Sequence, residues 1–247
     1  MKSRIFLNRA SQINEVLSLE LNVTHYLYSV LRMRTGDFLN GFDALGNTYN
    51  LRIVEIDSMF SKIVVESIQA AKPDLLEVDL AQSLPRSTKM DLILRQGVEV
   101  GVHAFFPLVT RRTVSRPDVE SWQGKQKRLE KIIIEACRQC RRNQVPNLNL
   151  PIKFLEFLKY FKNYDLVLMP YEHQALDLSA TLQHHPTAQK ILVLIGPEGG
   201  WDPEEIHQAM QLQAEVVHLP TPILRTETAG IVAVSMIFYA YHCLLSQ

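Results

Sequence analysis

The sequence has few cysteines, no internal repeat and no surplus of either charge. Three cysteines among 247 residues are too few for a disulfide framework, so we expect a protein of the reducing cytoplasm. Cys137 and Cys140 form a single C-x-x-C without a second pair, so we expect no metal site. No apolar core follows the basic residues within Met1–Ala10, and we therefore expect no signal peptide.

Basic residues concentrate in the middle of this neutral chain. Residues 86–144 contain 13 Lys and Arg against 6 Asp and Glu, whereas from residue 145 onward the numbers are 5 and 10. The basic residues recur in separate segments, at 111–112, 125–128 and 138–142. This distribution favours a local patch for a polyanion, although solvated helix faces are the alternative.

Two segments of different pattern predict two domains. Residues 1–72 contain β-branched runs and a hairpin signal at Asp43–Asn47, which predict a small β-rich domain. From residue 73 strands and helices alternate, as in a parallel α/β sheet of about five or six strands. The apolar run Ala229–Leu245 is short for a membrane span and contains polar side chains, so it favours a buried or interface helix instead.

The spacing of apolar residues places the elements of both domains. In the first domain we expect a helix at 24–33 and strands at 38–42, 49–56 and 62–68. In the second we expect strands at 76–81, 103–109, 165–169, 191–195 and 216–219, with helices at 86–100, 122–141 and 152–161. Ligands bind to open parallel sheets at the carboxyl ends of such strands.

A glycine-rich turn follows the buried aliphatic run Ile191–Ile195. Gly199-Gly200 permits backbone angles closed to other residues, and Asp202 and Glu205 have the spacing of a helix capping box. The G-x-G-x-x-G spacing of a dinucleotide loop is absent, and the central residue, Glu198, would repel phosphate. The turn therefore favours a cationic or neutral ligand.

A second strand, loop and helix follow near the C-terminus. Ile195-Gly-Pro-Glu-Gly-Gly-Trp and then Ile223-Leu-Arg-Thr-Glu-Thr-Ala resemble the two motifs of the RsmE family, the ribosomal RNA uracil-N3 methyltransferases of the SPOUT class. Weaker matches extend around Lys89–Gly101 and Gln139–Pro146. The resemblance therefore covers most of the second domain.

The resemblance implies a fold, a reaction and partners. The fold would be an α/β SPOUT trefoil-knot domain with a parallel sheet at 73–247, preceded by a PUA-like, RNA-binding small β-barrel domain at 1–72. The reaction would be S-adenosyl-L-methionine-dependent methylation of uracil N3 of a specific uridine in 16S ribosomal RNA. The enzyme would be a cytoplasmic homodimer that acts on the small ribosomal subunit and has no membrane partner. The alternatives are a non-catalytic RNA-binding or ribosome-assembly protein and a SPOUT methyltransferase with a different RNA target.

Residues of both motifs would hold the cofactor in this resemblance. They are Leu194, Gly196, Pro197, Glu198, Gly199, Gly200, Leu219, Ile223, Leu224, Arg225, Thr228 and Ala229. For the aliphatic side chains among them, packing in the core is the alternative. Glu198 would meet the cationic end of the cofactor or serve as a structural acid of the turn.

Arg225 and Glu227 are the candidate catalytic residues. Methylation at uracil N3 requires loss of a proton, and an arginine stays charged and cannot normally act as a base. Arg225 can instead stabilise the developing anion. Glu227 can orient Arg225 or accept a proton, and the alternative is a helix N-terminal charge that complements the dipole.

Three arginines, Arg32, Arg112 and Arg142, are the candidate RNA-binding residues, with solvated arginines as the alternative. The chain departs from the family pattern at several positions. Arg95-Gln96 stands where the family usually has a Gln-Lys pair, Arg111 replaces an acid, and Pro220 and Pro222 replace a glycine and an arginine. They alter where positive charge lies and bear on RNA contacts more than on the cofactor site.

Overall fold

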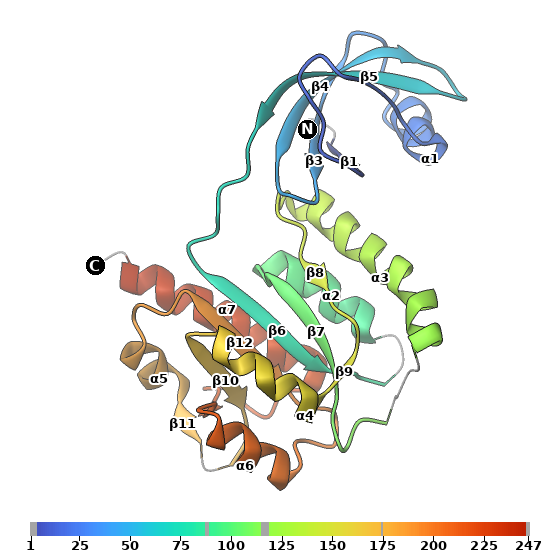
Figure 1. Cartoon of the computed structure of the whole chain (residues 1–247). Coiled ribbons are helices and arrows are strands. Elements are labelled where there is room, and N and C mark those ends of the chain that lie inside the picture. The colour runs from blue at the N-terminus through green and yellow to red at the C-terminus, as the bar shows by residue number, and fades with distance from the viewer. Residues whose placement is uncertain (1–3, 87–88, 115–118, 174, 246–247) are drawn as a thin grey trace. The chain divides into compact units, whose positions relative to one another are not determined.

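The chain divides into two compact units. A computed structural model describes residues 4–86, 89–114, 119–173 and 175–245 (Figure 1). Unit 1 comprises Met1–Pro73 and Cys137–Val145, and unit 2 comprises Asp74–Ala136 and Pro146–Gln247. The functions expected for domains at 1–72 and 73–247 stay predictions.

Unit 1 is built on a five-stranded sheet. Its order is β1 (Arg4–Leu7), β3 (Phe38–Asp43), β4 (Thr48–Ile56), β5 (Ser61–Gln69) and β2 (Val16–Ser18), with β1 and β3 parallel and the other pairs antiparallel. Alternating residues of β4 and β5 point to the core, where Leu51, Ile53, Ile63 and Val65 are fully buried. The predicted small β-rich fold is therefore confirmed.

The helix expected at 24–33 differs from the observed one. It begins earlier, as α1 (Leu21–His25), and continues as a π-helical turn, η1 (Tyr26–Val30). The Leu31 N–H donates to the carbonyl of Tyr26, five residues back, and Arg32 then adopts a left-handed φ of 54°. That backbone conformation ends the helix.

The segment Cys137–Val145 completes unit 1. Arg4 donates to the Cys137 carbonyl at 3.4 Å and to Asn143 Oδ1 at 2.6 Å, and its guanidinium lies 4.0 Å from the centre of the Phe42 ring. The guanidinium of Arg138 lies 4.6 Å from the centre of the Tyr26 ring. These contacts explain why residues distant in sequence belong to the N-terminal unit.

Unit 2 contains a parallel sheet of eight strands in the part of the chain that the structure describes. The order is β11 (Leu176–Asp177), β13 (Glu215–His218), β10 (Leu166–Pro170), β12 (Lys190–Ile195), β6 (Glu77–Ser83), β7 (Ala104–Val109) and β8 (Asn147–Leu148), and β9 (Ile152–Lys153) also pairs with β7. All five strands predicted for this sheet are confirmed. The three strands that were not expected have two residues each, too short for a period to appear.

Helices connect these strands. They are α2 (Lys89–Val100), α3 (Val119–Cys140), α4 (Phe154–Phe157), the 3-10 helix η2 (Leu158–Asn163), α5 (Leu178–His184), α6 (Pro203–Gln211) and α7 (Thr226–Leu245). The continuous helix expected at 152–161 is wrong, because its first two residues pair with β7 as a strand. The start of the helix expected at 86–100 includes residues 87–88, which lie outside the described residues.

The C-terminal helix α7 packs on the sheet, beside β6 and β12 (Figure 1). A Cβ at Gly230 would lie 3.0 Å from Leu80 Cδ1, so the helix backbone approaches the sheet closely. Ala233, Val234 and Ile237 are buried, whereas Tyr239 is exposed. Among the described residues, no helix has both the length and the apolar character needed to cross a membrane.

Candidate functional site

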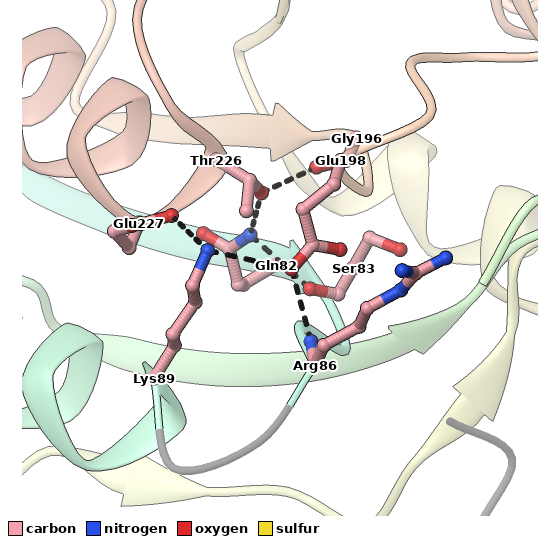
Figure 2. Close-up of polar contacts among 8 residues, drawn as sticks. All are labelled: Gln82, Ser83, Arg86, Lys89, Gly196, Glu198, Thr226 and Glu227. Atoms are coloured by element: carbon pink, nitrogen blue, oxygen red, sulfur yellow. Dashed lines mark hydrogen bonds and ion pairs between the residues drawn. The ribbon is translucent and has the colours of Figure 1, made fainter. Parts of the chain in front are cut away.

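The two motifs meet although their strands are not adjacent. β12 and β13 both pair with β10, which lies between them, so their loops leave the same edge of the sheet. The Thr226 hydroxyl, in the second motif, donates to the Gly196 carbonyl in the first at 2.6 Å (Figure 2). The expected side-by-side placement of the two loops is confirmed by this direct hydrogen bond.

The first loop is held in shape by its own sequence. Asp202 is the N-cap of α6, and Glu205 completes the predicted capping box by accepting from the Asp202 N–H at 3.2 Å. Gly200 has a φ of 70°, a conformation that favours glycine. The Trp201 ring is buried, with its centre 5.2 Å from that of Phe154.

Two arginines join the β7–α3 loop to this first loop. Arg111 pairs with Asp202 at 3.0 Å, and its backbone N–H donates to Glu205. The Arg112 guanidinium donates to the Gly199 carbonyl at 3.0 Å. The departure at Arg111 therefore supplies a partner for the cap of α6, and Arg112, a candidate for RNA phosphate, contacts the loop itself.

A lysine bridges an acid from each motif. Lys89 Nζ, at the start of α2, lies 3.1 Å from Glu227 Oε2 and 3.7 Å from Glu198 Oε1 (Figure 2). The backbone N–H of Arg86 donates to the same Glu198 oxygen at 3.0 Å. The side chains are only partly exposed, with Lys89 at 33%, Glu198 at 30% and Glu227 at 10%. We call this arrangement the Lys89 bridge.

Backbone N–H groups and the Lys89 bridge together keep both carboxylates charged. Desolvation favours protonation of Glu227, but hydrogen bonds from its own backbone N–H and from Lys89, with attraction from Arg225, lower its pKa below the ordinary value. For Glu198, desolvation is likewise outweighed by backbone N–H groups and by the charges of Lys89 and Arg86, so its pKa is also lowered. Carboxylates with lowered pKa values are weak bases at neutral pH.

A buried polar network lies beside the bridge at the carboxyl end of β6. Gln82 Nε2 donates to Thr226 Oγ1 at 2.9 Å and to the Ser83 carbonyl at 3.2 Å. The Ser83 hydroxyl contacts the buried hydroxyls of Thr110 and Thr113 at 3.2 and 2.8 Å. The end of β6 is thus joined both to the second motif and to the β7–α3 loop.

The aliphatic residues proposed as ligand walls differ in exposure. Leu194 is fully buried in the core of unit 2, and Leu219 is nearly so. Leu224 is half-buried, whereas Ile223 is 85% exposed. For Leu194 the side chain packs in the core, so its backbone is the part that a ligand would meet.

The remaining predicted residues fall in both units. In the motifs, Pro197 is buried, Gly196, Gly200 and Ala229 are half-buried, and Gly199, Arg225 and Thr228 are exposed. Arg32 is exposed and Arg142 is half-buried, and both belong to unit 1. Within the described ranges, no cluster of three or more His, Cys, Asp or Glu side chains forms a metal site. Burial raises the pKa of the Cys137 thiol to about 12, so this thiol is unreactive.

The sequence interpretation missed four members of this site. They are Gln82, Arg86, Lys89 and Thr226. All but Thr226 lie at or just after the carboxyl end of β6, the edge where ligands bind to parallel sheets. That position was the available signal, but the predicted strand ends at residue 81, one residue before Gln82.

The chain is similar in sequence and structure to known RNA methyltransferases. The model of a family described as RNA methyltransferase domain matches residues 72–238. Ribosomal RNA small subunit methyltransferase E of Bacillus subtilis is 31% identical in an alignment of 225 residues that covers 87% of this chain and 86% of the relative.

Two solved structures with bound cofactor resemble nearly the whole chain. Ribosomal RNA small subunit methyltransferase E from Neisseria gonorrhoeae, bound to S-adenosyl methionine, has a TM-score of 0.85 and 27% identity, covering 98% of each chain. A Legionella pneumophila protein with bound SAM has a TM-score of 0.87 and 27% identity, covering 97% of this chain and 98% of that one.

Proposed function

Because the chain belongs to the family of ribosomal RNA small subunit methyltransferase E, we propose that it transfers a methyl group from S-adenosyl-L-methionine to uracil N3 of a specific uridine in 16S ribosomal RNA. The observation that carries the proposal is the contact between the two motif loops through Thr226 and Gly196. The Lys89 bridge, which joins the same loops, supports it further.

The residues of the two loops fit this cofactor. The loops lie at the carboxyl edge of a parallel sheet, and backbone groups of Leu194–Gly200 and of Leu224–Ala229 would hold adenine and ribose. Glu198 is ionised, which suits a cationic ligand rather than a phosphate. When bound, S-adenosyl-L-methionine supplies an electrophilic methyl group on a positively charged sulfur. The knotted C-terminus of the SPOUT class belongs to the same proposal.

In this mechanism Arg225 stabilises the negative charge that develops on the uracil. Uracil N3 is a poor nucleophile until it loses its proton, and the charge of Arg225 stabilises the anion as it forms. Glu227 has a lowered pKa, so it orients Arg225 and Lys89 rather than accepting the proton. Of the two catalytic roles that the sequence left open for Glu227, the lowered pKa favours the orienting one.

The remaining assignments concern partners. Unit 1, with Arg32 and Arg142, contacts the RNA of the small subunit, and Arg112 contacts RNA phosphate beside the first loop. The chain acts in the cytoplasm as a homodimer. The exposed Ile223 in the second motif and the exposed Tyr239 on α7 support a partner subunit near the site.

Methyl transfer to small ribosomal subunits tests the proposed function. Purified protein, S-adenosyl-L-methionine and subunits lacking the modification are incubated, and the digested RNA is analysed by mass spectrometry for 3-methyluridine. We expect one methylated uridine per subunit. Cofactor binding without transfer would favour the non-catalytic alternative, and methylation of a different nucleotide would favour another RNA target.

Arg225→Ala tests the role of the arginine. Loss of a group that acts on the developing anion is expected to lower turnover by about a hundredfold or more, while the cofactor Kd changes by less than about threefold. Single-turnover rates and calorimetric affinities separate these quantities. Equal losses in turnover and affinity would make Arg225 a cofactor-pocket residue instead.

A further inference from the structure

Gln82 occupies a deep position between the two motifs. Its side chain is 1% exposed, and it lies opposite Ile195, the last residue of β12 before the first loop. Through Thr226 it also reaches the first residue of α7. Figure 2 shows the carboxamide together with Thr226, Lys89 and Glu198.

The orientation of the Gln82 carboxamide is fixed by its neighbours. The Thr226 hydroxyl uses its proton on the Gly196 carbonyl, so it can only accept from Gln82. The second neighbour, the Ser83 carbonyl, can also only accept. Exchanging Nε2 and Oε1 would place an acceptor against two acceptors, so the amino group must face Thr226 and Ser83.

The other end of the carboxamide is unsatisfied. Among the described residues, Gln82 Oε1 is buried and receives no hydrogen bond. A buried acceptor without a donor is costly, and most such atoms in native proteins have a partner in the protein, a water or a ligand. An acceptor held in a fixed direction at a ligand-binding edge is therefore suited to a donor that arrives with the ligand.

We propose that Gln82 is a cofactor-binding residue, whose Oε1 accepts a hydrogen bond from an N–H group of S-adenosyl-L-methionine. This inference rests on the proposed function. The molecule has two N–H groups, the adenine amino group and the ammonium of its methionine half. Gln82 is also a positioning residue, because its Nε2 orients Thr226 and, through it, the Gly196 carbonyl.

Calorimetric titration of the full-length protein with two probes tests the inference. The probes are S-adenosyl-L-methionine and 5′-methylthioadenosine, which lacks the amino-acid portion. Gln82→Met keeps the length of the side chain but removes the acceptor, and we expect about tenfold weaker binding of S-adenosyl-L-methionine. A loss with both probes identifies the adenine amino group as the donor, and a loss with the first alone identifies the ammonium.

Gln82→Glu separates the acceptor from the structural half of the side chain. A protonated glutamic acid donates to Thr226 and keeps a carbonyl acceptor, whereas the ionised form cannot donate. The affinity of this variant, relative to wild type at the same pH, is expected to rise as the pH falls. Thermal melts of both variants establish that they are folded.

Two results would overturn the inference in different ways. If wild-type protein binds S-adenosyl-L-methionine and Gln82→Met binds both probes within twofold of wild type, Gln82 makes no cofactor contact, while the proposed function stands. If wild-type protein does not bind S-adenosyl-L-methionine, the proposed function fails and the inference fails with it. A pH-independent affinity ratio for Gln82→Glu would contradict the positioning role of Nε2, because both forms of the glutamate side chain keep an acceptor.

Discussion

The Lys89 bridge provides a test of how the two loops are held. Lys89→Met keeps the apolar stem of the side chain and removes the charge that separates Glu198 from Glu227. The two carboxylates would then face each other without a cation between them. We expect both a less stable unit 2 and weaker cofactor binding, because the same loops carry the proposed cofactor residues.

The magnitude follows from distance and exposure. Hydrogen bonds to charged groups contribute about 1.5–3 kcal/mol, and exposed ion pairs about 0.2–1 kcal/mol. The 3.1 Å contact to Glu227 is the more buried of the two, so we assign it about 1.5 kcal/mol. The 3.7 Å contact to Glu198 is more exposed, and we assign it about 0.5 kcal/mol. The expected loss in the free energy of unfolding is about 2 kcal/mol.

A matched control exists in unit 1. Lys62 pairs with Glu55 at the same 3.1 Å distance, but both side chains are about half exposed, at 46% and 51%. Lys62→Met is expected to cost about 0.5 kcal/mol or less and to leave cofactor affinity unchanged. Denaturant unfolding and calorimetric titration compare the variants, with about tenfold weaker cofactor binding expected for Lys89→Met. If the two variants are equal in stability and affinity, the reasoning about the bridge is wrong.

Two further predictions concern the first loop and the carboxylates. Gly196→Ala puts a Cβ 3.1 Å from Nε1 of the buried Trp201, so we expect its free energy of unfolding to be about 1–2 kcal/mol lower than that of wild type. Gly199→Ala gains only ordinary contacts and should melt like wild type. Equal melting temperatures for the two variants would contradict this prediction. Because the pKa values of Glu198 and Glu227 are lowered, their stabilising effect is fully present above the ordinary glutamate pKa of about 4.3 and disappears as the pH falls through the lowered values. Acid titration of stability should therefore be steeper for wild type than for Glu198→Gln/Glu227→Gln, and identical slopes would refute it.

The local parts of the site could be predicted from the sequence. The strand Ile191–Ile195 and the caps Asp202 and Glu205 depend on neighbours within a few residues, so their pattern is visible in the chain. The same holds for the strand before the second motif. Both loops were therefore predicted with their strands and helices.

The long-range parts could not be predicted. Lys89 and Glu227 are 138 residues apart, and no local pattern indicates that they pair. The segment 152–161 fails for the same reason, because pairing of β9 with β7 overrides a helical spacing of apolar residues. The Gln82–Thr226 contact likewise depends on where α7 begins relative to β6.

Unit 1 is made from two separate stretches of chain, and this affects when it can fold during synthesis. Domains usually fold one after another as the nascent chain emerges. Here the acceptors for Arg4, the Cys137 carbonyl and Asn143, emerge only after β6, α2 and β7 have been made. These contacts within unit 1 can therefore form only after the next unit has begun to emerge. A fragment that ends at Pro73 would contain the strands of unit 1 but lack the segment Cys137–Val145. Isolated unit 1 is therefore best expressed with Cys137–Val145 joined to it by a linker.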